Sequence, residues 1–152
     1  MTAWTERAGL RAITLHPWWA WAVAHGDKRR EFRTRPYPRA LEGVAVALHA
    51  GRATPGEARG PGSTRLEEAA SQGAPVAGWR AAGAPASCVV ALVTFGEILE
   101  TASSSARFAW EITHVWTLCR PVPAAGRQGW WTLDASTWLE VDARLPAGAV
   151  LP

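Results

Sequence analysis

The sequence has few of the residues that several common chemistries require. It lacks a glycine-rich phosphate-binding loop, and its four histidines and two cysteines are scattered without the spacing of a zinc or non-haem iron site. Cys88 and Cys119 lie in apolar, strand-like runs, so we expect buried free thiols, with a disulfide as the alternative. These absences predict a protein that uses no metal and no cofactor.

Long hydrophobic runs are also missing. No apolar run approaches the roughly 20 residues needed to span a bilayer. The first residues do not form a secretory signal peptide, because Glu6 and Arg7 interrupt the pattern. We therefore expect a cytoplasmic protein that contacts no membrane. The 152 residues, of which 48% are hydrophobic, suit a single domain over residues 1–152, and we expect it to be a monomer.

Tryptophan and arginine are abundant instead. Ten tryptophans are too many to be all interior, although some must build the core because each ring buries roughly 150–250 Å². Arginine greatly outnumbers lysine, a bias that high genomic GC content also produces. The segment from Asp27 to Arg39 contains six basic and two acidic residues. Its net positive charge is therefore larger than the net charge of +3 of the whole chain. The basic patch is therefore local. The six are Lys28, Arg29, Arg30, Arg33, Arg35 and Arg39.

Hydrophobic patterns predict a strand-rich order of elements, β-α-β-β-α-β-β-β. The expected strands cover residues 11–15, 29–35, 44–49, 87–99, 108–118 and 130–133, and the expected helices cover 17–25 and 65–72. Pro17 and Gly26 suit the two ends of the first helix, and Thr64 with Glu67 forms a capping box for the second. Short strands with little room for crossover helices favour a compact mixed sheet or barrel.

Some segments give weaker signals. The alternation of the strand over 108–118 is imperfect near His114, which indicates a bulge, and Pro121 and Pro123 are expected to end it. Residues 52–62 and 73–86 are rich in glycine, proline and small residues, so they are predicted to be loops, with Trp79 in the second. No structure is predicted for the tail from Asp134.

The segment from His16 to Thr34 carries the main functional signal. An aromatic, apolar helix ends at a glycine and is followed at once by Lys28, Glu31 and Arg33. Aromatic planes next to clustered cations suit a ligand with a stackable ring and a negative charge, such as a nucleotide or a nucleic acid. Lys28 would place a charge on phosphate or, if burial lowers its pKa, act as a base or nucleophile.

The other two charged side chains have similar double interpretations. Glu31 would accept a proton from a base edge or act as a general acid or base, and Arg33 would bind a phosphate or carbonyl in a bidentate manner. The structural alternative is an ion pair between Glu31 and Arg33 on one strand face, with Lys28 in solvent. Trp18, Trp19 and Trp79 are candidate stacking platforms, with a core position as the alternative, and His49 is a further candidate at a strand end.

Several of these motifs together resemble the ASCH (activating signal cointegrator homology) family of the PUA-like superfamily. They are Leu15-His16-Pro17-Trp18, Gly26-x-Lys28-x-x-Glu31-x-Arg33, Val46-Ala47-Leu48-His49-Ala50-Gly51, the strand from Cys88, and the segments 110–116 and 126–131. The resemblance covers about residues 11–133. It implies an α+β, PUA-like mixed β-barrel of five to six strands with two or three short helices, one of which closes a mouth of the barrel. It also implies a cleft beside the first helix that contains Lys28.

The resemblance also implies functions. Domains of this superfamily generally bind RNA or DNA, and several bind a modified base. Some ASCH members resemble enzymes that hydrolyse acetylated cytidine, and others are reported as ribonucleases. In the amidohydrolase type a threonine follows the lysine by three residues and a glutamate lies on a later helix. Here Glu31 takes the threonine position, and Glu67 or Glu68 would have to supply the later glutamate.

Three hypotheses follow. The favoured one is a nucleic-acid-binding domain with a basic, tryptophan-lined cleft for RNA, or less favourably DNA, as a single strand or a modified base. The second is a hydrolase of modified nucleosides, or a ribonuclease, with Lys28 and Glu31 as catalytic residues. The third is a protein-interaction domain with exposed tryptophans as anchors. The binding residues of the first are Trp18, Trp19, Lys28, Arg29, Arg30, Glu31, Arg33, Arg35, His49 and Trp79.

Overall fold

The computed structural model describes residues 9–152, so Glu6 and Arg7 of the signal-peptide argument lie outside the described residues. The strands are β1 (Arg11–Leu15), β2 (Arg30–Arg33), β3 (Val46–Ala50), β4 (Cys88–Glu100), β5 (Phe108–Pro123) and β6 (Trp130–Thr132). The helices are α1 (Pro17–His25), α2 (Pro55–Arg59), α3 (Thr64–Ser71), α4 (Val76–Ala81) and α5 (Ala135–Ala143), with a 3-10 turn η1 (Arg39–Leu41) before β3.

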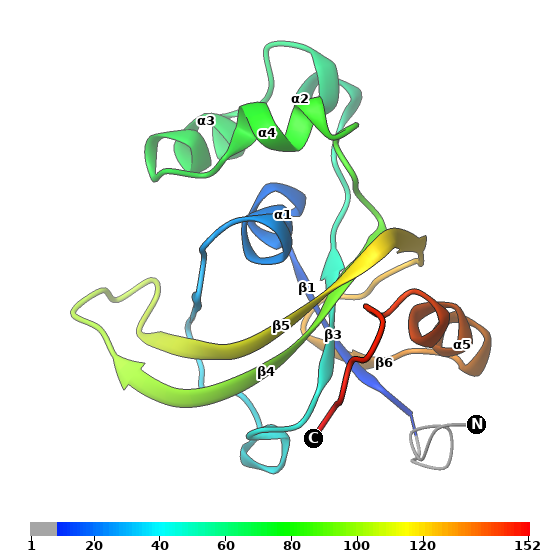
Figure 1. Ribbon diagram of the computed structural model, residues 1–152. Helices are drawn as coiled ribbons and strands as arrows, with labels where there is room; N and C mark the ends of the chain where they lie inside the picture. The colour runs from blue at the N-terminus through cyan, green and yellow to red at the C-terminus, as the bar shows by residue number, and fades with distance from the viewer. Residues whose placement is uncertain (1–8) are drawn as a thin grey trace.

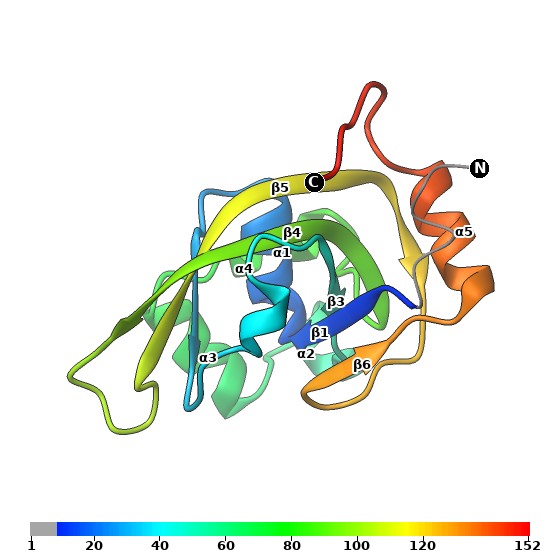
Figure 2. The same ribbon diagram turned by 90° about the horizontal axis from the view of Figure 1, so that it is seen from below.

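The six strands form one sheet in the order β2-β5-β4-β3-β1-β6, and the long strands β4 and β5 curl it strongly (Figures 1 and 2). Only β1 and β3 are parallel neighbours, so the predicted mixed, barrel-like α+β sheet is confirmed. The predicted bulge near His114 is also confirmed. Thr94 pairs with His114 and Phe95 pairs with Ile112, which leaves Thr113 as an extra residue on β5.

Side chains rather than a backbone ladder close the curled sheet. Arg33 on the edge strand β2 donates from a guanidinium nitrogen to the carbonyl of Thr14 in β1, at 2.9 Å. Trp110 of β5 stacks on Trp130 of β6 with ring centroids 6.0 Å apart and planes within 14°. These contacts join the two ends of a sheet in which β2 and β6 are not hydrogen-bonded neighbours. They form the seam of the barrel.

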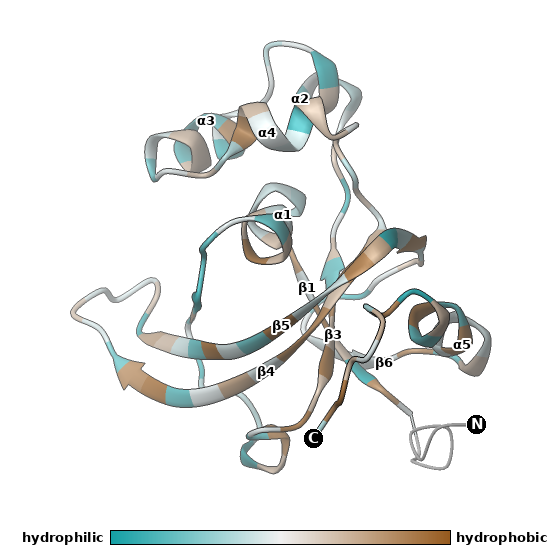
Figure 3. Cartoon of the chain, viewed as in Figure 1, coloured by the Kyte–Doolittle hydropathy of each residue, from teal (hydrophilic) through white to brown (hydrophobic). Residues whose placement is uncertain are grey.

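Helix α1 lies between the curled sheet and the layer of α2, α3 and α4 (Figure 1). The all-apolar pattern of α1 predicts burial, and six of its nine residues are buried. Ala20, Val23 and Ala24 pack into the core of the barrel against hydrophobic residues of β3 and β4. Figure 3 shows hydrophobic residues, in brown, along both of these strands. Trp18 packs on the other side, against the helical layer. The helix therefore joins two cores.

The predicted loops over 52–62 and 73–86 are wrong, because both contain a short helix. Thr54 and Glu57 form a complete capping box at the start of α2, which stabilises a helix inside a segment rich in glycine and proline. Ser63, and not Thr64, is the N-cap of α3, since its hydroxyl accepts from the Leu66 amide. The described residues hold five α-helices in place of the expected two or three.

Trp79 is the reason that α4 forms. Its ring is fully buried, lies edge-on to Trp18 with centroids 5.6 Å apart, and donates from Nε1 to the Pro85 carbonyl at 3.0 Å. A tryptophan expected in a loop is instead the core of the helical layer. Its burial holds a helix of six residues that would be marginal alone.

Three smaller corrections concern the second half of the chain. Strand β5 continues past Pro121 to Pro123, because a register shift opposite Val89 and Ala91 accommodates the prolines. The tail contains α5, which Asp134 caps by accepting from the Thr137 amide. Of the two cysteines, Cys88 is buried as expected, whereas Cys119 is exposed.

Glu57 is the polar centre of the helical layer. Its side chain is 1% exposed and receives hydrogen bonds from the Thr54 amide, the Ser63 hydroxyl and two nitrogens, Nε and Nη2, on one edge of the Arg65 guanidinium. Hydrogen bonding to Arg65 is the main reason that the pKa of Glu57 falls to about 2, against the opposing effect of burial. The ionised carboxylate thereby connects α2 to α3.

Replacing Glu57 with Gln should lower the free energy of unfolding by about 2 kcal/mol at neutral pH, because hydrogen bonds to a charged group are lost. The folded carboxyl has the lower pKa, so its stabilisation is present above pH 4.5 and is lost as the pH falls toward 2. Urea denaturation at several pH values measures both effects. Glu68→Gln, on the exposed face of α3, is the matched control. Equal stability of the Glu57 and Glu68 variants would show that Glu57 does not connect the two helices.

Candidate functional site

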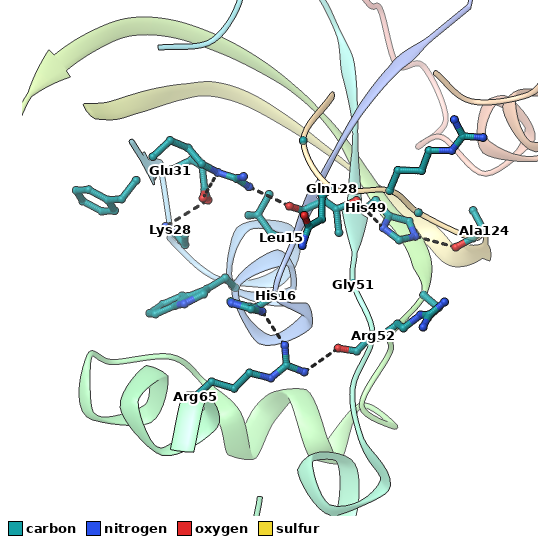
Figure 4. Close-up of a pocket in the computed structure, with 18 of the residues that line it drawn as sticks. Leu15, His16, Lys28, Glu31, His49, Gly51, Arg52, Arg65, Ala124 and Gln128 are labelled. Carbon is teal, nitrogen blue, oxygen red and sulfur yellow. Dashed lines mark hydrogen bonds and ion pairs between the residues drawn. The ribbon is translucent and has the colours of Figure 1, made fainter. Parts of the chain in front are cut away.

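A cleft of about 1760 Å³ opens beside α1. Its walls come from the end of β1, the start of α1, the strand β2, the end of β3, Arg65 of α3, and the segment 123–129 before β6 (Figure 4). Seven basic side chains line it against two acidic ones. The basic ones are Lys28, Arg29, Arg30, Arg33, Arg52, Arg65 and Arg127, and the acidic ones are Asp27 and Glu31.

Glu31 is a buried carboxylate held between two cations. Its side chain is 11% exposed and accepts from the Arg33 Nε at 3.1 Å, while the Lys28 Nζ lies 3.8 Å from the other carboxylate oxygen. Burial raises the pKa of Glu31, and the positive charges of Lys28 and Arg33 oppose that shift. Burial thus favours the neutral acid, whereas the two neighbouring cations favour the ionised carboxylate.

Lys28 is not in solvent. Its ammonium group lies 5.1 Å from the ring centre of Trp19 and 5.3 Å from that of Phe32, and it also donates to the Arg30 carbonyl. Burial lowers the pKa of Lys28, and the nearby Glu31 only partly restores it. An amine of this kind, on the wall of a cleft, has the environment of a functional lysine.

The structure therefore contains the ion pair between Glu31 and Arg33 of the structural interpretation, but it places Lys28 on the cleft wall, as the ligand-binding interpretation requires. Arg33 has a structural role, because Glu31, the Thr14 carbonyl and the face of Trp110 at 5.8 Å occupy its guanidinium. Lys28 remains on the cleft wall with aromatic neighbours, which the structural alternative did not foresee. The Glu31–Arg33 ion pair thus has a structural role in the cleft wall, and Lys28 is the residue of the motif that is available to the cleft.

The other three predicted cations, Arg29, Arg30 and Arg35, differ in their surroundings. Arg29 donates to the Val23, Gly26 and Lys28 carbonyls and so caps the end of α1. Arg30 lines the cleft, is exposed, and has no side-chain partner among residues 9–152. Arg35 is exposed but does not line the cleft.

Two of the three predicted stacking tryptophans have no open ring face. Trp18 and Trp79 are both 0% exposed and pack on each other, which removes them from the stacking set. Trp19 is half-buried and lines the cleft. The exposed aromatic ring of the cleft is Phe32, at 49% exposure, which sequence reasoning missed because strand alternation does not reveal which face is covered.

His49 lies in the cleft wall but is 2% exposed. The Trp131 indole donates to the Thr14 hydroxyl at 3.0 Å, that hydroxyl lies 3.1 Å from His49 Nδ1, and His49 Nε2 donates to the Ala124 carbonyl at 2.7 Å. This series satisfies a neutral imidazole, and burial lowers the pKa of His49 in agreement. His49 therefore fastens the segment 123–129 to β3.

Sequence reasoning missed several further polar residues of the cleft, among them His16, Arg52, Arg65, Arg127 and Gln128. His16 follows directly on β1 and Arg52 lies two residues after the end of β3, which were the available signals. The other three reach the cleft only through the fold. Neither Glu67 nor Glu68 lines the cleft, so neither can supply the later glutamate of the amidohydrolase type.

Over residues 9–152 no three His, Cys, Asp or Glu side chains gather as a metal site. Within the same range no helix has both the length and the apolar character needed to cross a membrane. No described tryptophan is exposed, which leaves the protein-interaction hypothesis without its proposed anchors.

Lys28 is the only lysine of the chain, so its titration can be followed directly. After reductive methylation with ¹³C-formaldehyde, Lys28 should titrate below the ordinary 10.5 in the folded protein. In Glu31→Gln it should titrate lower still, because a neighbouring negative charge is removed. The chain unfolded in urea is the control and should restore the ordinary value. A folded-state value at or above the unfolded one would contradict the burial of this amine.

No protein-family model matches the sequence, and no curated protein sequence matches it significantly. Solved structures do match. They include the crystal structure of ASCH from Zymomonas mobilis and those of two mutants of that protein, each at 13% identity and a TM-score of 0.54. The alignments cover 91% of this chain and 96%, 97% and 100% of the three matched chains. At this identity the likeness concerns the fold alone: the chain has the α+β fold of these ASCH structures.

Proposed function

We propose that the cleft binds nucleic acid as a single strand, RNA in preference to DNA. The observation that carries this is a set of three exposed arginines, Arg30, Arg52 and Arg127, around a cleft whose inner wall offers Trp19 and Phe32. None of the three guanidinium groups has a side-chain partner among the described residues. The preference for RNA rests on family precedent.

The three arginines suit phosphate groups. An exposed guanidinium without an ion-pair partner donates charge-assisted hydrogen bonds to a phosphate, and its binding releases counterions of the strand. The internally paired cations Arg33 and Arg65 are less available, since Glu31 and Glu57 already neutralise them. The positive charge available to a ligand therefore comes from Arg30, Arg52 and Arg127, together with Lys28 on the same cleft.

The aromatic rings suit bases. Phe32 is a large hydrophobic side chain at 49% exposure, and the ring of Trp19 contacts the same Lys28 ammonium. Stacking of a base on an aromatic ring contributes about 1–3 kcal/mol and tolerates any sequence. The volume of about 1760 Å³ exceeds the roughly 300–1,000 Å³ of small-molecule pockets, which favours several nucleotides over one nucleoside.

Binding of labelled oligouridine should weaken steeply with salt, as measured by fluorescence anisotropy. Arg52→Gln and Arg127→Gln should each lower the slope of log affinity against log salt by about 0.7. Phe32→Ala should weaken binding by about 1–3 kcal/mol without changing the slope. Arg120→Gln, an exposed arginine of β5 outside the cleft, is the matched control. Absence of binding to any RNA or DNA at low salt would refute the proposal, and oligothymidine tests the preference for RNA.

A second candidate function, hydrolysis of a modified nucleoside or of RNA, has its own support. Lys28 and Glu31 lie 3.8 Å apart in the cleft, and burial shifts their pKa values toward the neutral amine and the neutral acid. One bridging water or a small movement would bring this pair into the geometry for proton transfer. The absence of a suitable later glutamate weighs against the amidohydrolase type.

If the protein is a hydrolase, incubation with acetylated cytidine or end-labelled RNA should yield product. Lys28→Arg should then lower the rate by about 10²–10⁴-fold, because arginine keeps the charge but cannot act as a base. The same variant should retain most of its affinity for oligouridine. Equal, residual product formation by the wild-type protein and by Lys28→Arg would exclude Lys28 catalysis and leave the binding proposal intact.

A further inference from the structure

Arg65 fixes the hydrogen on the imidazole of His16. One guanidinium nitrogen of Arg65 lies 3.2 Å from His16 Nδ1. A guanidinium has donors only, so Nδ1 must accept, and the ring proton must reside on Nε2. His16 therefore presents a donor at Nε2.

The position of Arg65 is itself determined by two further contacts. Its Nε and one terminal nitrogen donate to the two oxygens of Glu57 at 2.7 and 2.8 Å, and that same terminal nitrogen donates to the Arg52 carbonyl at 3.2 Å. Glu57 is fully buried and bound by the capping box of α2. The guanidinium thus cannot rotate away from His16 without breaking a bidentate ion pair.

The imidazole of His16 is also held in place and kept neutral. Its ring stacks on Trp18 with centroids 5.3 Å apart and planes within 15°. Burial, followed by the positive charge of Arg65, lowers the pKa of His16. A second proton would have to enter at Nδ1, directly against the guanidinium.

The free edge of this ring belongs to the cleft. His16 lines the cleft and lies between Arg65 and the wall that carries Lys28 (Figure 4). Within residues 9–152 the Nε2 atom has no hydrogen-bond partner, whereas Nδ1 and one ring face are occupied. An oriented donor without a protein acceptor is suited to a ligand oxygen.

We propose that His16 is a neutral hydrogen-bond donor to an acceptor oxygen of the bound nucleic acid, with Arg65 as its positioning residue. The inference rests on the proposed function, since it needs a nucleic acid in the cleft. The favoured acceptor is a phosphate oxygen, because the exposed Arg52 lines the same cleft as His16 and makes the cleft attractive to an anion. Unlike the arginines, a neutral imidazole releases no counterion when it binds.

The salt dependence separates these two kinds of contact. His16→Phe should lower the affinity for oligouridine about fivefold with an unchanged salt slope, because one neutral hydrogen bond is lost. The phenyl ring keeps the stacking on Trp18. His25→Phe, at the far end of α1 and outside the cleft, is the matched control and should bind as the wild type.

The tautomer can be measured without any variant of His16. Long-range ¹⁵N–¹H NMR spectra of the wild-type protein should show His16 as the Nε2–H form at pH 7, and oligouridine should shift its Nε2 resonance. Arg65→Gln should raise the pKa of His16 and mix the tautomers, which a purely structural role for Arg65 would not do. His16→Phe at wild-type affinity, or an Nδ1–H tautomer, would overturn the assignment.

The outcomes also separate this inference from the proposed function. Wild-type binding that does not respond to His16→Phe refutes the role of His16 alone. Failure of the wild-type protein to bind any strand removes both proposals. An oligomer of abasic nucleotides, which keeps every phosphate and lacks base carbonyls, identifies the acceptor. A His16 effect that persists there supports phosphate, and one that disappears supports a base carbonyl as the acceptor oxygen.

Discussion

The buried carboxylate of Glu31 is the constraint on which the rest of the site depends. A carboxylate taken out of water needs charge partners, and this one takes Arg33 and Lys28. Arg33, held there, reaches the Thr14 carbonyl and forms part of the seam of the barrel. Lys28, held there, lies across Trp19 and Phe32. The buried carboxylate of Glu31 therefore positions both the arginine that closes the sheet and the only lysine of the chain.

The cations of the cleft consequently have separate tasks. The inner ones complete the structure: Arg33 closes the barrel, Arg29 caps α1, and Arg65 joins the helical layer through Glu57. The outer ones, Arg30, Arg52 and Arg127, form no ion pair among residues 9–152. A count of basic residues overstates the positive field of the site, because each inner arginine is already neutralised or bound to carbonyls. The helical layer also contributes to the cleft, since Arg65 connects it to His16.

Much of the fold could be predicted from the sequence because its signals are local. The apolar run of β4, the apolar surface of α1 and the glycine after it needed no tertiary information. Helices α2 and α4, of five and six residues, could not be recognised by periodicity, and their stability comes from Glu57 and from burial of Trp79. The site followed the same rule. Lys28, Glu31 and Arg33 are close in sequence, whereas His16, Arg52 and Arg127 meet only when distant segments pack.

The seam between β2 and β1 has a consequence for how such a protein diversifies. If main-chain hydrogen bonds joined the two edge strands of the barrel, its diameter could change only through a change in the register of the strands. Here a single guanidinium and one pair of stacked indoles span the gap. Substitutions at those few positions can widen or narrow the mouth while the six-stranded order is preserved. The order of the strands and the width of the barrel at the seam are therefore set by different residues.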